Sequence, residues 1–232
     1  MMGDRNINIG GSVSGSAFVV GDGNVVNSQQ QSSQSSAIPA SSPAAKHKLL
    51  ILAANPKDTV RLRLGEEVRE ISEGLQRAKQ RDDFNIVQRW AVRPRDFQRA
   101  MLEELPQLVH FSGHGVEEEG LYFEDEVGAP KLVNSSALAS LFKLFSLKAK
   151  IECVVLNGCY SAAQAEAIVQ HVPYAVGMTG EVGDRAAIEF VVGFYDALGS
   201  GESIPFAFES GKVAMEINST GYIEMPVLLT KK

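Results

Sequence analysis

The sequence has few of the features that mark secreted, membrane or nucleic-acid-binding proteins. Only two cysteines, Cys153 and Cys159, occur among its 232 residues, too few for a disulfide framework or a zinc cluster. No apolar run is long enough to span a bilayer, and the N-terminus lacks the regions of a signal peptide. The formal net charge is -6, and Lys and Arg form no stripe that would bind a phosphate backbone. We therefore expect a cytoplasmic protein with no metal or cofactor, and with neither membrane nor nucleic acid as a partner.

Charge is also scarce in residues 1–27, where glycines separate short β-prone runs. Within this segment, Val19–Val26 is typical of two small strands around a glycine turn. Residues 28–46 are mostly Ser, Gln, Ala and Pro, and they offer too little apolar surface to offset their ordering entropy. The sequence thus predicts a glycine-rich β segment at 1–27, a disordered tether at 28–46 and a globular domain at 47–232.

In the globular domain, apolar strands alternate with amphipathic helices, a pattern that predicts an α/β fold with a largely parallel sheet flanked by helices. Strands are expected at 49–54, 84–91, 107–112, 151–156, 174–178 and 222–229, with a hairpin at 121–123 and 131–133. Helices are expected at 64–80, 96–105, 160–170, 184–198 and 203–216, and a further helix capped by Asn134 or Ser135 is expected to run through Phe145.

Two of the predicted strands end in a reactive residue beside glycine. One leads into Gly113-His114-Gly115 and the other into Asn157-Gly158-Cys159. The carboxyl ends of parallel strands meet at one edge of a sheet, so the two side chains are expected together. A helix that begins at Tyr160 would favour the Cys159 thiolate, and the pair would serve as nucleophile and proton carrier. From the spacing alone, a packed apolar cysteine after a buried strand is the alternative.

The other histidines and the second cysteine have simpler interpretations. His110 lies inside a predicted strand and is expected to be structural, while His47 and His171 are expected at the surface. Cys153 lies in an apolar strand and is expected in the core.

The sequence resembles the CHAT family of caspase-like cysteine peptidases over residues 47–217. The segments that carry the resemblance are Leu52–Pro56, Leu62–Val68, Val109–Gly115, Val155–Ala162 and Phe194–Gly201. The resemblance implies a caspase-like fold, a protein substrate, His114 as general acid and base, and Cys159 as nucleophile. It also implies that the amides of Gly115 and Cys159 are the oxyanion donors, and it implies no third catalytic residue.

The chain departs from many CHAT relatives beside the expected catalytic residues. It has Asn157-Gly158 where many have Ser-Ala, and Thr179-Gly180 where many have Trp-Pro, so its substrate preference is expected to differ. Asp184 matches an acidic position of the family, which implies a substrate-binding pocket that favours a basic residue on the acyl side of the cut bond. A helix cap is the alternative role for Asp184, and Glu181 is a second candidate for the pocket.

The N-terminal segment resembles the short amyloid-type signalling motifs of bacterial immune effectors, through Phe18–Val26. Low charge and high β propensity agree with stacking of identical copies. The resemblance implies self-association, an upstream sensor with a matching motif, and a role in prokaryotic defence or programmed death. A hairpin folded onto its own protease domain is the alternative. The residues expected in the assembly are Val19, Val20, Gly21, Asn24, Val25 and Val26.

Two functions other than a peptidase are alternatives for this sequence. A catalytically silent adaptor with the same fold would bind a partner protein, and an intact His114 and Cys159 pair argues against it. A nucleotide-binding α/β domain would need a glycine-rich phosphate loop after the first strand, where this chain has Asn55-Pro56 instead.

Overall fold

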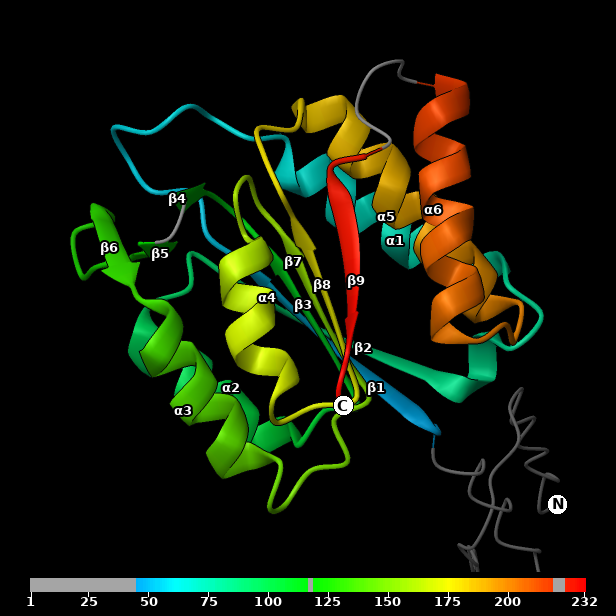
Figure 1. The fold of residues 1–232 in the computed structure, drawn as a ribbon, viewed down its shortest axis with the longest axis horizontal. Coiled ribbons are helices and arrows are strands. Elements are labelled where there is room, and N and C mark those ends of the chain that lie inside the picture. The colour runs from blue at the N-terminus through cyan, green and yellow to red at the C-terminus, as the bar shows by residue number, and fades with distance from the viewer. Residues whose placement is uncertain (1–44, 117–118, 219–223) are drawn as a thin grey trace, which may run out of the picture. The chain divides into compact units, whose positions relative to one another are not determined.

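The computed structural model describes residues 45–116, 119–218 and 224–232 (Figure 1). The predictions for residues 1–27, and those for nearly all of 28–46, lie outside these described residues.

A six-stranded sheet forms the centre of the domain, with strand order β2-β1-β3-β7-β8-β9. All neighbouring strands are parallel except β8 and β9, which are antiparallel. The predicted α/β fold with a largely parallel sheet is therefore confirmed. The strands are β1 (His47–Ala53), β2 (Phe84–Trp90), β3 (Leu108–Ser112), β7 (Cys153–Asn157), β8 (Tyr174–Met178) and β9 (Pro226–Thr230).

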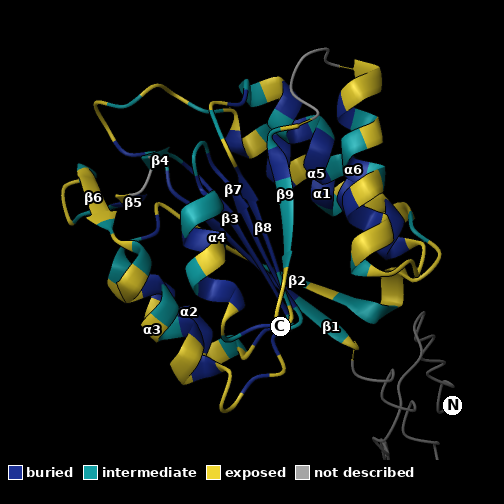
Figure 2. Cartoon of the chain, in the orientation of Figure 1, coloured by how far each residue is buried: buried dark blue, intermediate teal, exposed yellow. Residues whose placement is uncertain are grey.

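Three helices cover each face of this sheet (Figure 1). Successive strand residues point to opposite faces, so on β1 Leu49 and Ile51 pack in one core cluster while Leu50 and Leu52 pack in the other. Both faces of the central strands are buried (Figure 2), as expected for a parallel sheet. One cluster includes α1 (Leu64–Arg77), α5 (Asp184–Gly199) and α6 (Ile204–Asn218), and the other includes α2 (Pro94–Glu104), α3 (Ser135–Phe145) and α4 (Ala162–Val169).

A second, three-stranded antiparallel sheet follows β3, in the order β4-β5-β6. The predicted hairpin corresponds to β5 (Gly120–Glu124) and β6 (Pro130–Val133). Strand β4 (Gly115–Val116) is only two residues long, too short to give a periodic sequence signal.

Two helices begin two residues away from their predicted starts. α2 begins at Pro94, because proline fits the first helical position, where its missing N–H is not needed. α4 begins at Ala162, because Tyr160 has a left-handed backbone with a φ of 55°. The helix expected from Tyr160 therefore starts two residues later.

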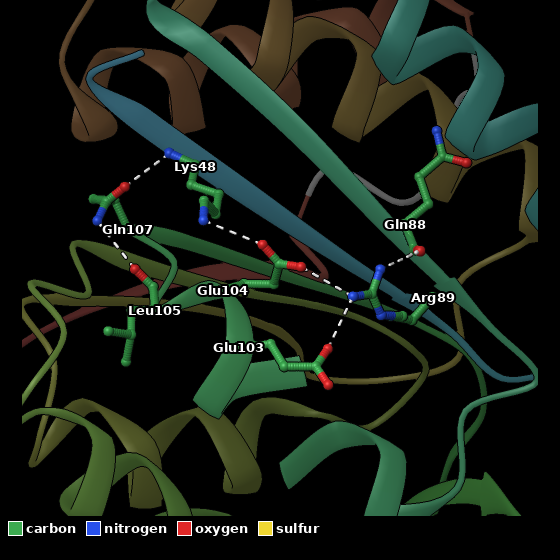
Figure 3. A network of polar contacts seen from close by, with 7 residues as sticks. All are labelled: Lys48, Gln88, Arg89, Glu103, Glu104, Leu105 and Gln107. Carbon is green, nitrogen blue, oxygen red and sulfur yellow. Dashed lines mark hydrogen bonds and ion pairs between the residues drawn. The ribbon is translucent and has the colours of Figure 1, made fainter. Parts of the chain in front are cut away.

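A charged network ties α2 to the edge of the sheet (Figure 3). The Arg89 guanidinium of β2 contacts Glu103 at 3.3 Å and Glu104 at 2.9 Å, and Lys48 of β1 reaches Glu104 at 3.1 Å. Partly exposed pairs of this kind contribute about 0 to 1 kcal/mol each. They orient α2, while the buried apolar clusters stabilise the fold.

Candidate active site

The structure places His114 and Cys159 around one pocket at the carboxyl edge of the central sheet. His114 lies two residues beyond β3 and Cys159 two residues beyond β7, and these strands are neighbours in which Ser112 pairs with Asn157. The pocket is lined by Leu62, Leu64, Glu67, Gly113, His114, Asn157, Gly158, Cys159, Met178, Val182, Asp184 and Ala187.

Glycine allows the loop of His114 and the loop of Cys159 to meet backbone to backbone. A Cβ atom added at Gly115 would lie 2.0 Å from the carbonyl oxygen of Cys159, and one added at Gly158 would lie 2.6 Å from that of Gly113. Both distances are shorter than any real contact of a Cβ atom, so no side chain fits at either position. The glycines that the sequence places beside the two reactive residues therefore set the separation of the two loops.

The amide of Gly115, an expected oxyanion donor, points away from its neighbouring strand. Tyr122 donates its backbone N–H to the carbonyl of His114 at 2.9 Å, so Gly115 and Leu121 form the next, non-hydrogen-bonded pair of the ladder. In such a pair the N–H groups face outward, which leaves the Gly115 amide free of β5. The oxyanion role of Gly115 and Cys159 stays a prediction.

The hydrogen bonds described for His114 and Cys159 go to flanking loops. The Nε2 of His114 donates to the carbonyl of Val60 at 2.7 Å. The Sγ of Cys159 accepts from the backbone N–H of Val182 at 3.4 Å and lies 3.7 Å from the Val182 carbonyl. Each reactive side chain thus contacts a loop next to the pocket, and a neutral His114 ring that donates from Nε2 has Nδ1 as its proton acceptor.

The late start of α4 changes the expected electrostatics of Cys159. The helix begins at Ala162 after Ser161 as its N-cap residue, so Cys159 precedes the helix instead of standing in its first turn. The field of a helix dipole falls off within about one turn. The predicted contribution of this dipole to a Cys159 thiolate is therefore weaker than the sequence indicated.

Asp184 is the first residue of α5, but its carboxylate does not cap this helix. The N-cap residue is Gly183, with no side-chain cap bond. Instead, Asp184 Oδ2 accepts from Arg63 twice, from Nε at 2.8 Å and from the backbone N–H at 3.3 Å. The hydrogen bond to Asp184 is the main cause that raises the pKa of Arg63. Glu181 is exposed and is not among the residues that line the pocket.

The pocket has almost no free room in this state. Its free volume is about 30 Å³, which is space for about one water molecule. Leu62 and Asp184 both line it, and Arg63 joins their two segments. The pocket in this state is therefore too small for a substrate side chain.

A buried polar cluster beneath the pocket was not predicted from the sequence. Glu67, His110, Ser112 and Asn157 are each at most 6% exposed, and hydrogen bonds connect them. The apolar face of α1 held a signal for it, because Glu67 shares that face with Leu64, Val68 and Ile71. A charged residue at such a position needs a buried partner.

Among the residues with simpler expectations, His47 and His171 were expected at the surface, and the structure shows both half-buried. His110, expected to be structural, is fully buried. Cys153 is also buried, and burial raises the pKa of its thiol well above the ordinary value. Among the described residues, no three His, Cys, Asp or Glu side chains are grouped as metal ligands. Within the same residues, no helix has the length and apolar character needed to cross a membrane.

The family model of the CHAT domain matches residues 14–219. The chain belongs to the CHAT family. A probable protease from Gillisia limnaea is 24% identical over 179 residues, which cover 76% of this chain and 32% of that protein. A Roc-COR-CHAT protease from an unidentified prokaryote is 27% identical over 174 residues, covering 73% of this chain and 16% of that protein. The CHAT chain thus spans less than a third of the length of either relative.

Solved structures of caspase-like cysteine proteases share the fold at low sequence identity. A secreted C11 cysteine protease from Bacteroides thetaiotaomicron, bound to an irreversible peptide inhibitor, matches with a TM-score of 0.59 at 12% identity, over 79% of this chain and 65% of its own. The Drosophila initiator caspase Dronc matches with a TM-score of 0.54 at 13% identity, over 93% of both chains. Gingipain R, an Arg-specific cysteine proteinase, matches with a TM-score of 0.56 at 10% identity, over 82% of this chain and 48% of its own. The predicted caspase-like fold is confirmed.

Proposed function

We propose that this CHAT domain is a cysteine endopeptidase in which Cys159 is the nucleophile and His114 carries the protons. The observation that supports it best is the placement of the two side chains at the ends of neighbouring parallel strands, around one pocket. Family membership and the names of both relatives, each called a protease, agree with this proposal.

In the proposed reaction, His114 accepts the thiol proton of Cys159 while Sγ attacks the carbonyl carbon of the peptide bond. The amides of Gly115 and Cys159 stabilise the oxyanion. His114 then gives the proton to the leaving nitrogen, the C–N bond breaks, and a thioester remains on Cys159. In the second half, His114 takes a proton from water, the hydroxide attacks the thioester, and the proton returns to the sulfur as it leaves.

The pocket next to Cys159 is proposed to bind a basic side chain on the acyl side of the cut bond. Asp184 lines this pocket, and its present partner is a guanidinium, that of Arg63. An Arg or Lys of the substrate would make the same charge-assisted contact with the carboxylate. Arg63 would have to release Asp184 first, so the domain would bind such a substrate only in an opened state.

We further propose that the domain has low activity until its N-terminal segments, residues 1–27, stack with those of other copies. The small free volume of the pocket supports a resting state of low activity. Stacking would concentrate the domains at the ends of their tethers, and domain pairing would then rearrange the loops. An upstream sensor with a matching motif, a cytoplasmic location and a role in prokaryotic defence or programmed death complete the proposal.

A catalytically silent adaptor is the second candidate, and the small free volume of the pocket beside Cys159 favours it. Labelling with a peptide that carries a thiol-reactive group separates the two functions. A peptidase should be labelled at Cys159 by the peptide reagent far faster than by the reactive group alone, and His114→Ala should remove this advantage. Equal rates for both reagents, before and after assembly, would favour the adaptor.

A further inference from the structure

The buried cluster beneath the pocket is built around one carboxylate oxygen of Glu67. This Oε1 accepts from Asn157 Nδ2 at 2.9 Å and from the hydroxyl of Ser112, and it lies 2.7 Å from His110 Nε2. On the other side of the ring, His110 Nδ1 lies 3.1 Å from the hydroxyl of Tyr195. The members come from α1, β3, β7 and α5, so the cluster links two helices to the two strands that lead to the expected catalytic residues.

The direction of each hydrogen bond follows from the chemistry of the groups. A carboxylate oxygen only accepts, so His110 carries a proton on Nε2. Burial raises the pKa of Tyr195 well above its ordinary value, so its hydroxyl keeps its proton, and it forms a hydrogen bond with Nδ1 of His110. The hydrogen bonds therefore run in series from Tyr195 through His110 to Glu67.

Glu67 is the member of this cluster that contacts residues leading into both loops, those of His114 and Cys159. Ser112 and Asn157 are partners in the pairing of β3 and β7, and each stands two residues before an expected catalytic residue. A carboxylate that is 3% exposed is costly to bury, and its three donors lower that cost. Any shift of its oxygen moves the ends of both strands together.

We propose that Glu67 is a positioning residue for His114 and Cys159, and that Tyr195 and His110 hold it in place. This inference rests on the proposed peptidase function. His110 and Tyr195 are not among the residues that line the pocket, and His110 contacts both Glu67 Oε1 and, at 3.0 Å, the hydroxyl of Ser112. Glu67 has two alternative roles. It could be part of the core with no effect on catalysis, or, because it lines the pocket, it could bind the substrate side chain.

The test is a double-mutant cycle on the full-length chain with Glu67→Gln and Tyr195→Phe, which remove one charge and one hydroxyl. Ile71→Val is the matched control, because Ile71 is buried on the same face of α1 and has no polar link to the loops. Kinetic constants are measured with one peptide that is cut after Arg and one that is cut after Leu, and thermal unfolding is followed for every variant.

A positioning role predicts losses in kcat with KM unchanged, by the same factor for both peptides. We expect a loss of roughly 100-fold for Glu67→Gln, as for a misplacement of reacting groups by about 1 Å. For Tyr195→Phe, which removes one hydrogen bond, a loss of about fivefold is expected. Because Tyr195 and Glu67 act on the loops through the same cluster, the double variant should lose less than the product of the two single losses.

Several results would overturn the inference. A rise in KM confined to the Arg peptide would make Glu67 a substrate-binding residue. A loss of kcat in the double variant equal to the product of the two single losses would mean that the residues act independently. An equal loss of kcat in Ile71→Val would mean that the cluster has a purely structural role.

If the wild-type chain cuts neither peptide, the peptidase proposal fails first, and a second measurement still tests the inference. Iodoacetamide alkylates Cys159 in a Cys153→Ala background, where it is the remaining thiol. The positioning role predicts a changed alkylation rate in Glu67→Gln, a smaller change of the same sign in Tyr195→Phe, and the wild-type rate in Ile71→Val. Equal rates in all four chains would contradict it.

Discussion

Gly115→Ala should separate the loops of His114 and Cys159 and thereby reduce catalysis. The new Cβ atom would lie 2.0 Å from the Cys159 carbonyl oxygen, where ordinary contact begins at 3.4 Å. The obstacle is backbone on both sides, so no side chain can turn away to make room, and the loops must part by roughly 1 Å. A displacement of that size between reacting groups costs about 100-fold in rate.

The assay compares kcat/KM of Gly115→Ala with that of the wild-type chain, alongside thermal unfolding of both. Gly65→Ala is the control, because a Cβ atom there meets no other atom within 4 Å on helix α1. This control should keep full activity and gain about 0.4 to 1 kcal/mol of stability, since alanine reduces the freedom of the unfolded chain. Wild-type turnover in Gly115→Ala would refute the inference that the glycines set the geometry of the site.

Three further predictions concern the pocket and its activation. Arg63→Ala removes the group that holds Asp184, so turnover by the unassembled chain should rise severalfold for peptides cut after Arg and after Leu; unchanged turnover would mean that another contact closes the pocket. Asp184→Ala should weaken cleavage after Arg or Lys by about tenfold or more relative to cleavage after Leu, because a charged partner is lost; an equal loss for all peptides would argue against a specificity role. Deletion of residues 1–27 should leave a chain that is monomeric by light scattering and has low peptide turnover, and Val20→Lys should mimic the deletion. Fusion of the truncated chain to an unrelated oligomer should restore turnover. Full activity of a strictly monomeric truncation would contradict activation by assembly.

The fold was predictable because each local pattern agreed with the global architecture. Apolar runs such as 108–112 and 153–157 alternate with amphipathic helices, and that pattern predicts a parallel sheet. Glycine next to His114 and Cys159 indicated two strand ends as a candidate site, and the structure places both residues around one pocket.

The parts that could not be predicted depend on contacts between distant segments. The left-handed backbone of Tyr160 delays α4, and nothing in the local sequence requires it. The ion pair of Arg63 and Asp184 joins residues that are 121 positions apart, so no periodicity reveals it. Glu67 was visible as a charge on an apolar helix face, but its partners on β3, β7 and α5 were not.

The central claim, that His114 and Cys159 act together as a peptidase, is tested most directly by peptide hydrolysis. The full-length chain, allowed to assemble, is incubated with fluorogenic peptides of basic and apolar sequence, beside Cys159→Ala and His114→Ala. Cys153→Ala is the matched control, because it removes the buried thiol and leaves the pocket intact. The account predicts turnover by the wild-type and Cys153→Ala chains and none by the other two, all with similar unfolding temperatures. Turnover that persists in Cys159→Ala would contradict it.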